Sequence, residues 1–245
     1  GRFIITGSQD FAISQTVTQS LAGRVGQIVL LPLSRHELAA PLTIAQLIVS
    51  GGYPRLHKKE MLPHEFYPLY VKTYIERDVR QIKNIESLAL FKTFLSLCAG
   101  RVGQQINISS LAQDCSIGVT TARHWLSILE ASYIIFMLRP YHTNFKKRLT
   151  KMPKLYFYDT GIAASLLDIR TPEQLAIHFA RGQLFENMVI LEVLKTRLNK
   201  GHQANLFFWR DSTGREVDLI DEWGLQTNAF EIKAGTTPRP EDMGG

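Results

Sequence analysis

The run from Gly182 to Ala234 most constrains the fold, because a helical period changes to a strand period within it. Apolar residues spaced three and four apart predict a helix that ends at Gly201. The turn sequence at 211–214, Asp-Ser-Thr-Gly, predicts a hairpin between the first two of the strands that follow. The predicted strands are Leu206 to Arg210, Glu216 to Ile220 and Ala229 to Ala234.

Four charged residues in this run form a candidate site. Glu186 belongs to the helix and Asp218 to the second strand. Glu231 and Lys233 share one face of the third strand, because side chains alternate along a strand. Carboxylates that converge bind Mg²⁺ or Mn²⁺, and an adjacent lysine can stabilise developing charge on a phosphodiester. The alternative interpretation is a charged strand face in water.

The order of these residues resembles the PD-(D/E)xK nuclease-like superfamily. The resemblance implies a restriction-endonuclease-like αβ core at residues 182–245. It also implies Asp218 and Glu231 as metal ligands, Lys233 as the residue that assists the attacking water, and Glu186 as a further ligand or base. Such a core usually continues with another helix and strand, so we expect this domain to be incomplete.

Composition restricts the class of protein. No apolar run reaches the ~20 residues that span a bilayer, so we expect a cytoplasmic protein without a membrane partner. Cys98 and Cys115 have no partner at metal-binding spacing, and they are expected to be reduced core residues. The net charge of +6 is compatible with a polyanionic partner such as DNA.

The first forty residues read as strand, helix and strand, at 2–8, 13–21 and 27–33. This order resembles the closing part of an AAA+ ATPase core. The resemblance implies that Thr6 and Ser8 stand near a sensor position and that Arg24 stands near an arginine finger. Alternatively, Thr6 and Ser8 end a strand and Arg24 is a surface residue.

No phosphate-binding sequence G-x-x-x-x-G-K-[ST] occurs in the chain, and no strand ends in an acidic pair. We therefore expect no ATP hydrolysis by this chain alone. ATP binding is expected only in a longer protein, of which this chain would be the C-terminal part.

Residues 41–86 resemble the helical lid of prokaryotic AAA-like ATPases. A short helix, 43–50, precedes Gly51-Gly52-Tyr53-Pro54, and relatives bring such a segment close to the nucleotide, which implicates Gly52 and Pro54. The alternative is a plain turn. A long helix is predicted over 66–83, and its Glu-Arg-Asp cluster at 76–78 resembles a signature of the group or forms ion pairs on a helix face.

Residues 87–159 have the pattern of a winged helix, with three helices followed by two strands. The third helix, 119–131, would present Val119, Thr120, Arg123 and His124 outward, where a recognition helix contacts DNA. Between strands 133–139 and 154–159 lies a basic tip whose charges suit phosphates: Lys146, Lys147, Arg148 and Lys151. The alternative is a protein contact through the same helix.

The predicted fold class is a multidomain α/β and α+β protein: an AAA+ sheet remnant (1–40), a lid (41–86), a winged helix (87–159), a helical link (160–181) and the nuclease-like core (182–245). The first functional hypothesis is an ATPase-coupled protein that acts on DNA with a Mg²⁺- or Mn²⁺-dependent phosphodiesterase. The second is a non-catalytic, ATP-regulated module that binds DNA or protein. The third is an assembly unit of a homo-oligomer that associates around Arg24.

Overall fold

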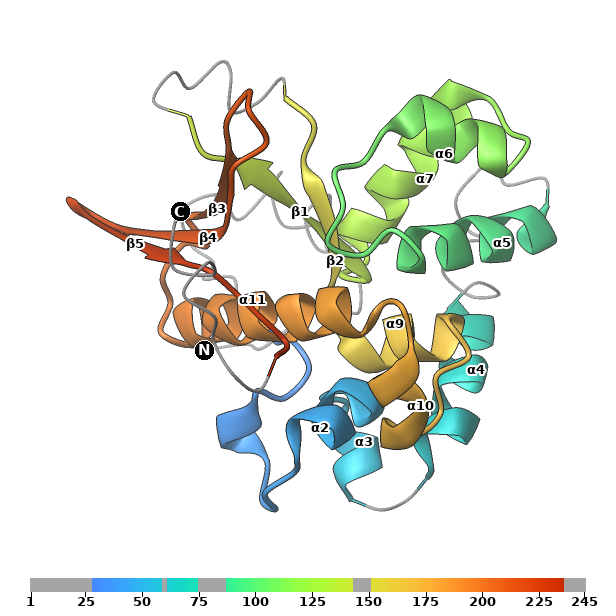
Figure 1. Ribbon diagram of the computed structural model, residues 1–245. Coiled ribbons are helices and arrows are strands. Elements are labelled where there is room, and N and C mark those ends of the chain that lie inside the picture. Colours follow the sequence, from blue (N-terminus) through green and yellow to red (C-terminus); the bar gives the residue numbers. More distant parts are fainter. Residues whose placement is uncertain (1–27, 59–60, 75–86, 143–150, 236–245) are drawn as a thin grey trace, which may run out of the picture.

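The computed structural model describes residues 28–58, 61–74, 87–142 and 151–235 (Figure 1). A short 3-10 helix, η1 (Arg35–Glu37), comes first. The α-helices are α2 (Ile44–Ser50), α3 (Pro54–His57), α4 (Pro63–Tyr74), α5 (Leu88–Ala99), α6 (Ile108–Asp114), α7 (Val119–Ala131), α9 (Thr160–Leu166), α10 (Pro172–Ile177) and α11 (Arg181–Asn199). The strands are β1 (Ile135–Pro140), β2 (Lys154–Phe157), β3 (Leu206–Arg210), β4 (Glu216–Trp223) and β5 (Gln226–Phe230).

The five strands form one mixed sheet in the order β2-β1-β3-β4-β5. The pair β1–β2 is antiparallel, β1 and β3 are parallel, and β3–β4–β5 is an antiparallel meander. The parallel pairing joins the strands that follow α7 to the strands that follow α11. The segments predicted as a winged helix and as a nuclease-like core therefore share a single sheet.

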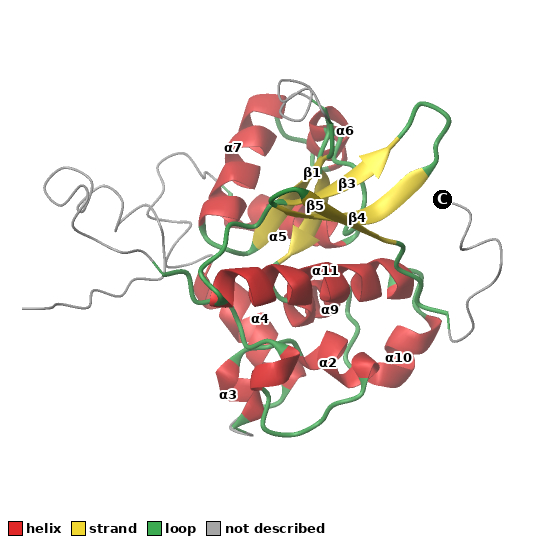
Figure 2. Ribbon diagram, turned by 90° about the vertical axis from the view of Figure 1, so that its left-hand side faces the viewer, coloured by secondary structure: helices red, strands yellow, loops and turns green. Residues whose placement is uncertain are grey.

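Helix α11 lies along one face of this sheet, and α2, α9 and α10 lie on the other side of α11 (Figures 1 and 2). Buried apolar side chains of these helices and of strands β1 to β4 belong to one continuous core, whereas β5 is exposed along its length. The expected link 160–181 contains α9 and α10, and Ile162, Ala163 and Ala164 of α9 are buried. Helix α9 is thus part of the core.

Helices α5, α6 and α7 form a unit beside the sheet (Figure 1). Ser87 and Asn107 cap α5 and α6 by accepting hydrogen bonds from backbone N–H groups. On α7, Ala122, Trp125 and Leu129 are buried, as their spacing predicts. Both cysteines are buried and free, which confirms their expected place in the core.

Some predicted elements differ from the structure. Residues 28–33 contain no strand, and Ile28 and Leu30 are exposed, so the strand predicted over 27–33 is wrong for this part. The backbone of Leu33 instead donates a hydrogen bond to the carbonyl of Gly52 over 2.7 Å, which is a contact with a helix junction and not with a strand edge. Helix α4 covers the first part of the helix predicted over 66–83, and Glu76 to Asp78 lie outside the described residues.

Within the residues described, no helix is both long and apolar enough to cross a bilayer.

Candidate functional site

Glu186 lies on the side of α11 that faces the sheet. Lys154, the first residue of β2, donates a hydrogen bond from Nζ to Glu186 Oε1 over 3.1 Å, and the hydroxyl of Tyr156 donates to the same oxygen. Burial raises the pKa of the Glu186 carboxyl, and the Lys154 charge and the Tyr156 hydrogen bond oppose that rise. Glu186 is thus held between α11 and β2.

Asp218 lies at a β-bulge in β4. Two residues of β4, Asp218 and Leu219, lie opposite the single residue Phe208 of β3. A bulge interrupts the alternation of side chains, so Asp218 and Asp221 can both face α11, although they are three positions apart. Asp221 accepts a hydrogen bond at Oδ1 from Nε of Arg197 in α11 over 2.5 Å, whereas Asp218 lies beside Lys154. The bulge therefore supplies two carboxylates to the same face of the sheet.

Lys154 connects these carboxylates, a role that its place at the start of an apolar strand does not predict. Its ammonium forms ion pairs with Glu186, with Glu216 and, at 3.9 Å, with Asp218. Its side chain is 4% exposed. Burial by itself would lower the pKa of Lys154, but the charges of Glu186 and Glu216 outweigh it and raise that pKa.

Glu231 and Lys233 form an ion pair with each other, with 37% and 49% of their side chains exposed. Strand β5 ends at Phe230, so the predicted strand over 229–234 ends too late. Beyond the end of β5, Ile232 donates its backbone N–H to the side chain of Asp218, at Oδ2, over 2.8 Å. This bond brings the Glu231–Lys233 pair next to Asp218. Burial raises the pKa of Asp218, and the hydrogen bond from Ile232 opposes the rise.

The structure thus brings only some of the four residues predicted for the site into direct contact. Glu186 and Asp218 meet at Lys154, and Glu231 and Lys233 flank Asp218 on the exposed side. Among the residues described, no three His, Cys, Asp or Glu side chains are arranged to hold a metal ion. The donor set does not fit a metal in this arrangement, because the Lys154 ammonium occupies the point on which the carboxylates converge.

Gly52 and Pro54 are the residues predicted to approach a nucleotide, and in the structure both belong to the packing around α3. Gly52 donates its N–H to Asp159 Oδ2 over 2.7 Å, and a side chain at this position would overlap the backbone of Leu33. Pro54 is in the first turn of α3. A nucleotide contact at these two residues remains a prediction, and Thr6, Ser8 and Arg24 lie outside the described residues.

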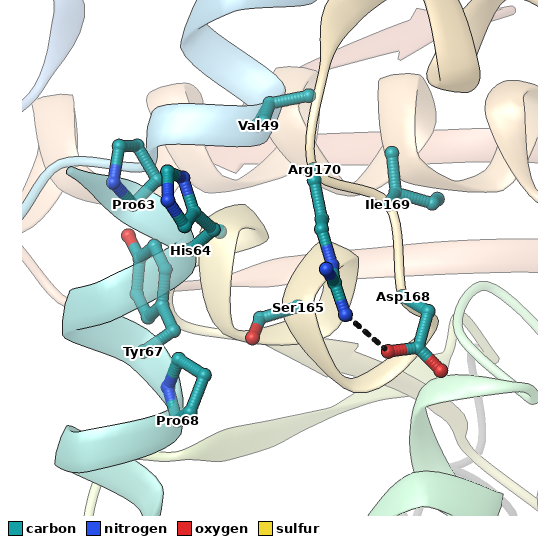
Figure 3. Close-up of a pocket in the computed structure, with 10 residues that line it drawn as sticks. Val49, Pro63, His64, Tyr67, Pro68, Ser165, Asp168, Ile169 and Arg170 are labelled. Atoms are coloured by element: carbon teal, nitrogen blue, oxygen red, sulfur yellow. Dashed lines mark ion pairs between the residues drawn. The ribbon is translucent and has the colours of Figure 1, made fainter.

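A small cavity lies between α4, α9 and the segment after α9 (Figure 3). Its volume is about 50 Å³, and an ion pair between Arg170 and Asp168, 3.8 Å apart, stands at one side. A cavity of this size holds water molecules but is too small for a nucleotide. It does not include Gly52 or Pro54 among its lining residues.

The predicted DNA-contacting residues of α7 are exposed. Thr120, Arg123 and His124 face solvent, and Val119 is 42% exposed. Of the basic tip, Lys151 is exposed, whereas Lys146, Lys147 and Arg148 lie outside the described residues. The outward face of α7 therefore agrees with the sequence pattern, and its binding of DNA remains a prediction.

Comparison with known proteins identifies two domains. Residues 42–173, more than half of the chain, match the domain of unknown function DUF8612. Residues 181–245 match the domain of unknown function DUF4143, a domain found in AAA-ATPase-associated proteins.

Two mycobacterial relatives, the uncharacterised proteins Rv2008c of Mycobacterium tuberculosis and Mb2031c of Mycobacterium bovis, are each 29% identical over 239 residues, which cover 97% of this chain and 53% of the relative. An uncharacterised protein of Haemophilus influenzae is 22% identical over 254 residues, covering 95% of this chain and 60% of the relative. The chain thus spans little more than half the length of these curated relatives. No solved structure matches it. Because the match to DUF8612 extends over more than half of the residues of this chain, the chain belongs to the family that DUF8612 defines.

Proposed function

We propose that this chain is a DNA-binding module of an ATPase-associated protein, and that its nuclease-like unit is a non-catalytic scaffold. In this proposal α5, α6, α7, β1 and β2 act as a winged helix, and α11 with β3–β5 is a decayed PD-(D/E)xK core. ATP binding would belong to the longer protein.

One observation carries the scaffold role. Lys154 comes from β2 of the winged-helix unit, yet its ammonium lies among the carboxylates of α11 and β4. A buried lysine paired in this way joins the two units and neutralises the acidic residues that a metal would need. Together with the continuous sheet, it supports a rigid body that presents α7 to a partner.

DNA is the partner that the charge supports. The chain carries a net charge of +6, and Arg123 and His124 are exposed on α7. Basic side chains on an exposed helix contribute to binding by neutralising phosphates. Homo-oligomerisation remains a separate proposal that rests on the sequence around Arg24.

A second candidate, a Mg²⁺- or Mn²⁺-dependent phosphodiesterase, has its own supporting observation. The hydrogen bond from Ile232 to Asp218 places Glu231 and Lys233 beside the buried carboxylate. Such an activity would need the carboxylates to be released from Lys154, and it would depend on Asp218 and Lys233.

The test is binding of a fluorescently labelled DNA duplex over a series of salt concentrations, with plasmid nicking measured in Mg²⁺ and Mn²⁺. We expect binding that weakens with salt, a salt slope reduced by about one in Arg123→Ala, and no nicking. Arg170→Ala, which changes an exposed arginine between α9 and α10, is the matched control and should bind as the wild type does. Nicking that is lost in both Asp218→Asn and Lys233→Ala would instead establish the phosphodiesterase. An absence of DNA binding would contradict the DNA-binding role and leave a protein contact through α7 as the alternative.

A further inference from the structure

Three carboxylates from two elements converge on one cation that belongs to the chain itself. Glu186 comes from α11, and Glu216 and Asp218 come from β4. Lys154 Nζ forms ion pairs with all three, at 3.1 Å from Glu186 and 3.9 Å from Asp218. Lys154 is 3% exposed, so water does not screen these contacts effectively.

The same oxygens are the ligands that a hard divalent cation would prefer. An ammonium at their common point excludes a metal ion for two reasons, since it fills the space and repels positive charge. It is also covalently attached to β2, so it does not dissociate. The cluster has three further partners among the described residues. The hydroxyl of Tyr156 donates to Glu186, the guanidinium of Arg210 lies 3.5 Å from Glu216, and the backbone N–H of Ile232 donates to Asp218, so none of them adds a free ligand oxygen.

We propose that the Lys154 ammonium is the permanent cation of this carboxylate cluster and stands where Mg²⁺ or Mn²⁺ would bind in a metal-dependent site of the same shape. This inference deepens the scaffold role proposed above and adds Glu216 to the residues of the site. The site is therefore closed to divalent metal in the native protein. Removal of the ammonium leaves Glu186 and Asp218 without the cation they share, while Glu216 keeps the guanidinium of Arg210, 3.5 Å away. The two released carboxylates should then accept a divalent ion.

The experiment compares thermal unfolding of the wild type and Lys154→Met in EDTA and in saturating Mn²⁺. We expect the Tm of the wild type to be the same in both. Lys154→Met should have a lower Tm in EDTA, and Mn²⁺ should raise it by about 5–10 °C because the ion binds only the folded state. Asp218→Asn added to Lys154→Met should abolish this response.

Lys195→Met is the matched control. Lys195 is also 3% exposed, but its ammonium donates to the carbonyl of Leu33 over 2.9 Å and contacts a single carboxylate, that of Glu192. Its removal should lower the Tm without creating a response to Mn²⁺. A response in Lys154→Met alone would separate a specific cation site from a general effect of losing a buried lysine.

Two results would overturn the proposal: a Tm of the wild type that rises with Mn²⁺ as much as that of Lys154→Met, or a folded Lys154→Met that does not respond. If Lys154→Met does not fold, Mn²⁺ binding to the wild type, measured by electron paramagnetic resonance, decides the matter. Stoichiometric binding that is lost in Asp218→Asn contradicts the proposal, and no binding supports it. Because these measurements contain no DNA, their failure leaves the DNA-binding role to its own test.

Discussion

Asn187 on α11 holds the backbone of Phe157, the last residue of β2, through two hydrogen bonds. Its Oδ1 accepts the N–H of Phe157 over 2.8 Å, and its Nδ2 donates to the carbonyl of Phe157 over 2.9 Å. Asn187 is fully buried. The side chain thus acts as a strand neighbour for the outer edge of β2, the edge strand whose first residue is Lys154.

Asn187→Leu should therefore destabilise the protein strongly. Leucine is similar in size but leaves one backbone donor and one acceptor of Phe157 buried without partners, each at about 1–3 kcal/mol. We expect a loss of about 2–6 kcal/mol in the free energy of unfolding, measured with urea. Asn199→Leu, at the exposed end of the same helix, should change it by no more than about 0.5 kcal/mol. Equal losses in the two variants would show that the contacts with Phe157 add no stability.

Gly161 of α9 is required because Tyr67 packs directly on its backbone. A Cβ atom at this position would overlap the ring and hydroxyl of Tyr67, which is 1% exposed and cannot move into solvent. Gly161→Ala should lose about 1–3 kcal/mol, as overpacked cores do. Gly182→Ala, in the first turn of α11 with no atom near the new Cβ, should be neutral or gain up to about 1 kcal/mol. Thermal unfolding of the two variants measures the difference, and a Gly161→Ala variant as stable as the wild type would contradict the packing argument.

Local patterns predicted the elements well. The strand 206–210 has the predicted bounds, and the helix predicted over 43–50 is α2, with Thr43 as its N-cap. The outward face of α7 also follows from its spacing of apolar residues. These features depend on residues within one or two turns of one another, and such information is present in any short stretch of sequence.

The composition of the site could not be predicted in the same way. Lys154 and Glu186 are 32 residues apart, and their contact depends on the packing of α11 against β2. The bulge at Asp218 likewise depends on how β3 and β4 pair, which the residues of β4 alone do not determine. A lysine at the start of an apolar strand indicates a surface position, and only its three carboxylate partners make burial favourable.

Arg197 and Asp221 join the end of α11 to β4. The guanidinium donates from Nε to Asp221 over 2.5 Å and from Nη1 to the carbonyl of Gln203 over 3.1 Å, and it lies 4.2 Å from the ring centre of Trp223. Their side chains are 3% and 9% exposed. A buried pair of this kind is costly to break, because the remaining charge is left without an opposite charge.

Arg197→Met and Asp221→Asn should therefore each lose about 3–5 kcal/mol in the free energy of unfolding. The double variant should lose less than the sum, since neither charge then remains alone. A cycle of urea unfolding curves for the four proteins measures this coupling. Additive losses would mean that the two side chains act independently, through Gln203 and Trp223 and not through each other.

Asp159 provides a test by pH, because its carboxylate is buried at the junction of α9 with Gly52 and Tyr67. It accepts hydrogen bonds from the Gly52 N–H and the Tyr67 hydroxyl, each over 2.7 Å, and from the Ile162 N–H over 3.2 Å. Burial nevertheless raises the pKa of Asp159 above its ordinary value of 3.8, against the effect of these bonds. The folded protein then holds this proton more tightly than the unfolded chain does.

A raised carboxyl pKa contributes stability that is complete below the unfolded value of 3.8 and is lost as the pH rises through the folded value. Asp159→Asn cannot titrate, so it serves as the reference. We expect the free energy of unfolding of the wild type, minus that of Asp159→Asn, to fall as the pH is raised from 3.8 through the folded pKa, and then to remain level. Urea unfolding of both proteins over this range measures the difference. A difference that grows with pH would contradict this expectation. It would mean that the three hydrogen bonds outweigh burial, so that the folded protein stabilises the Asp159 carboxylate as an anion.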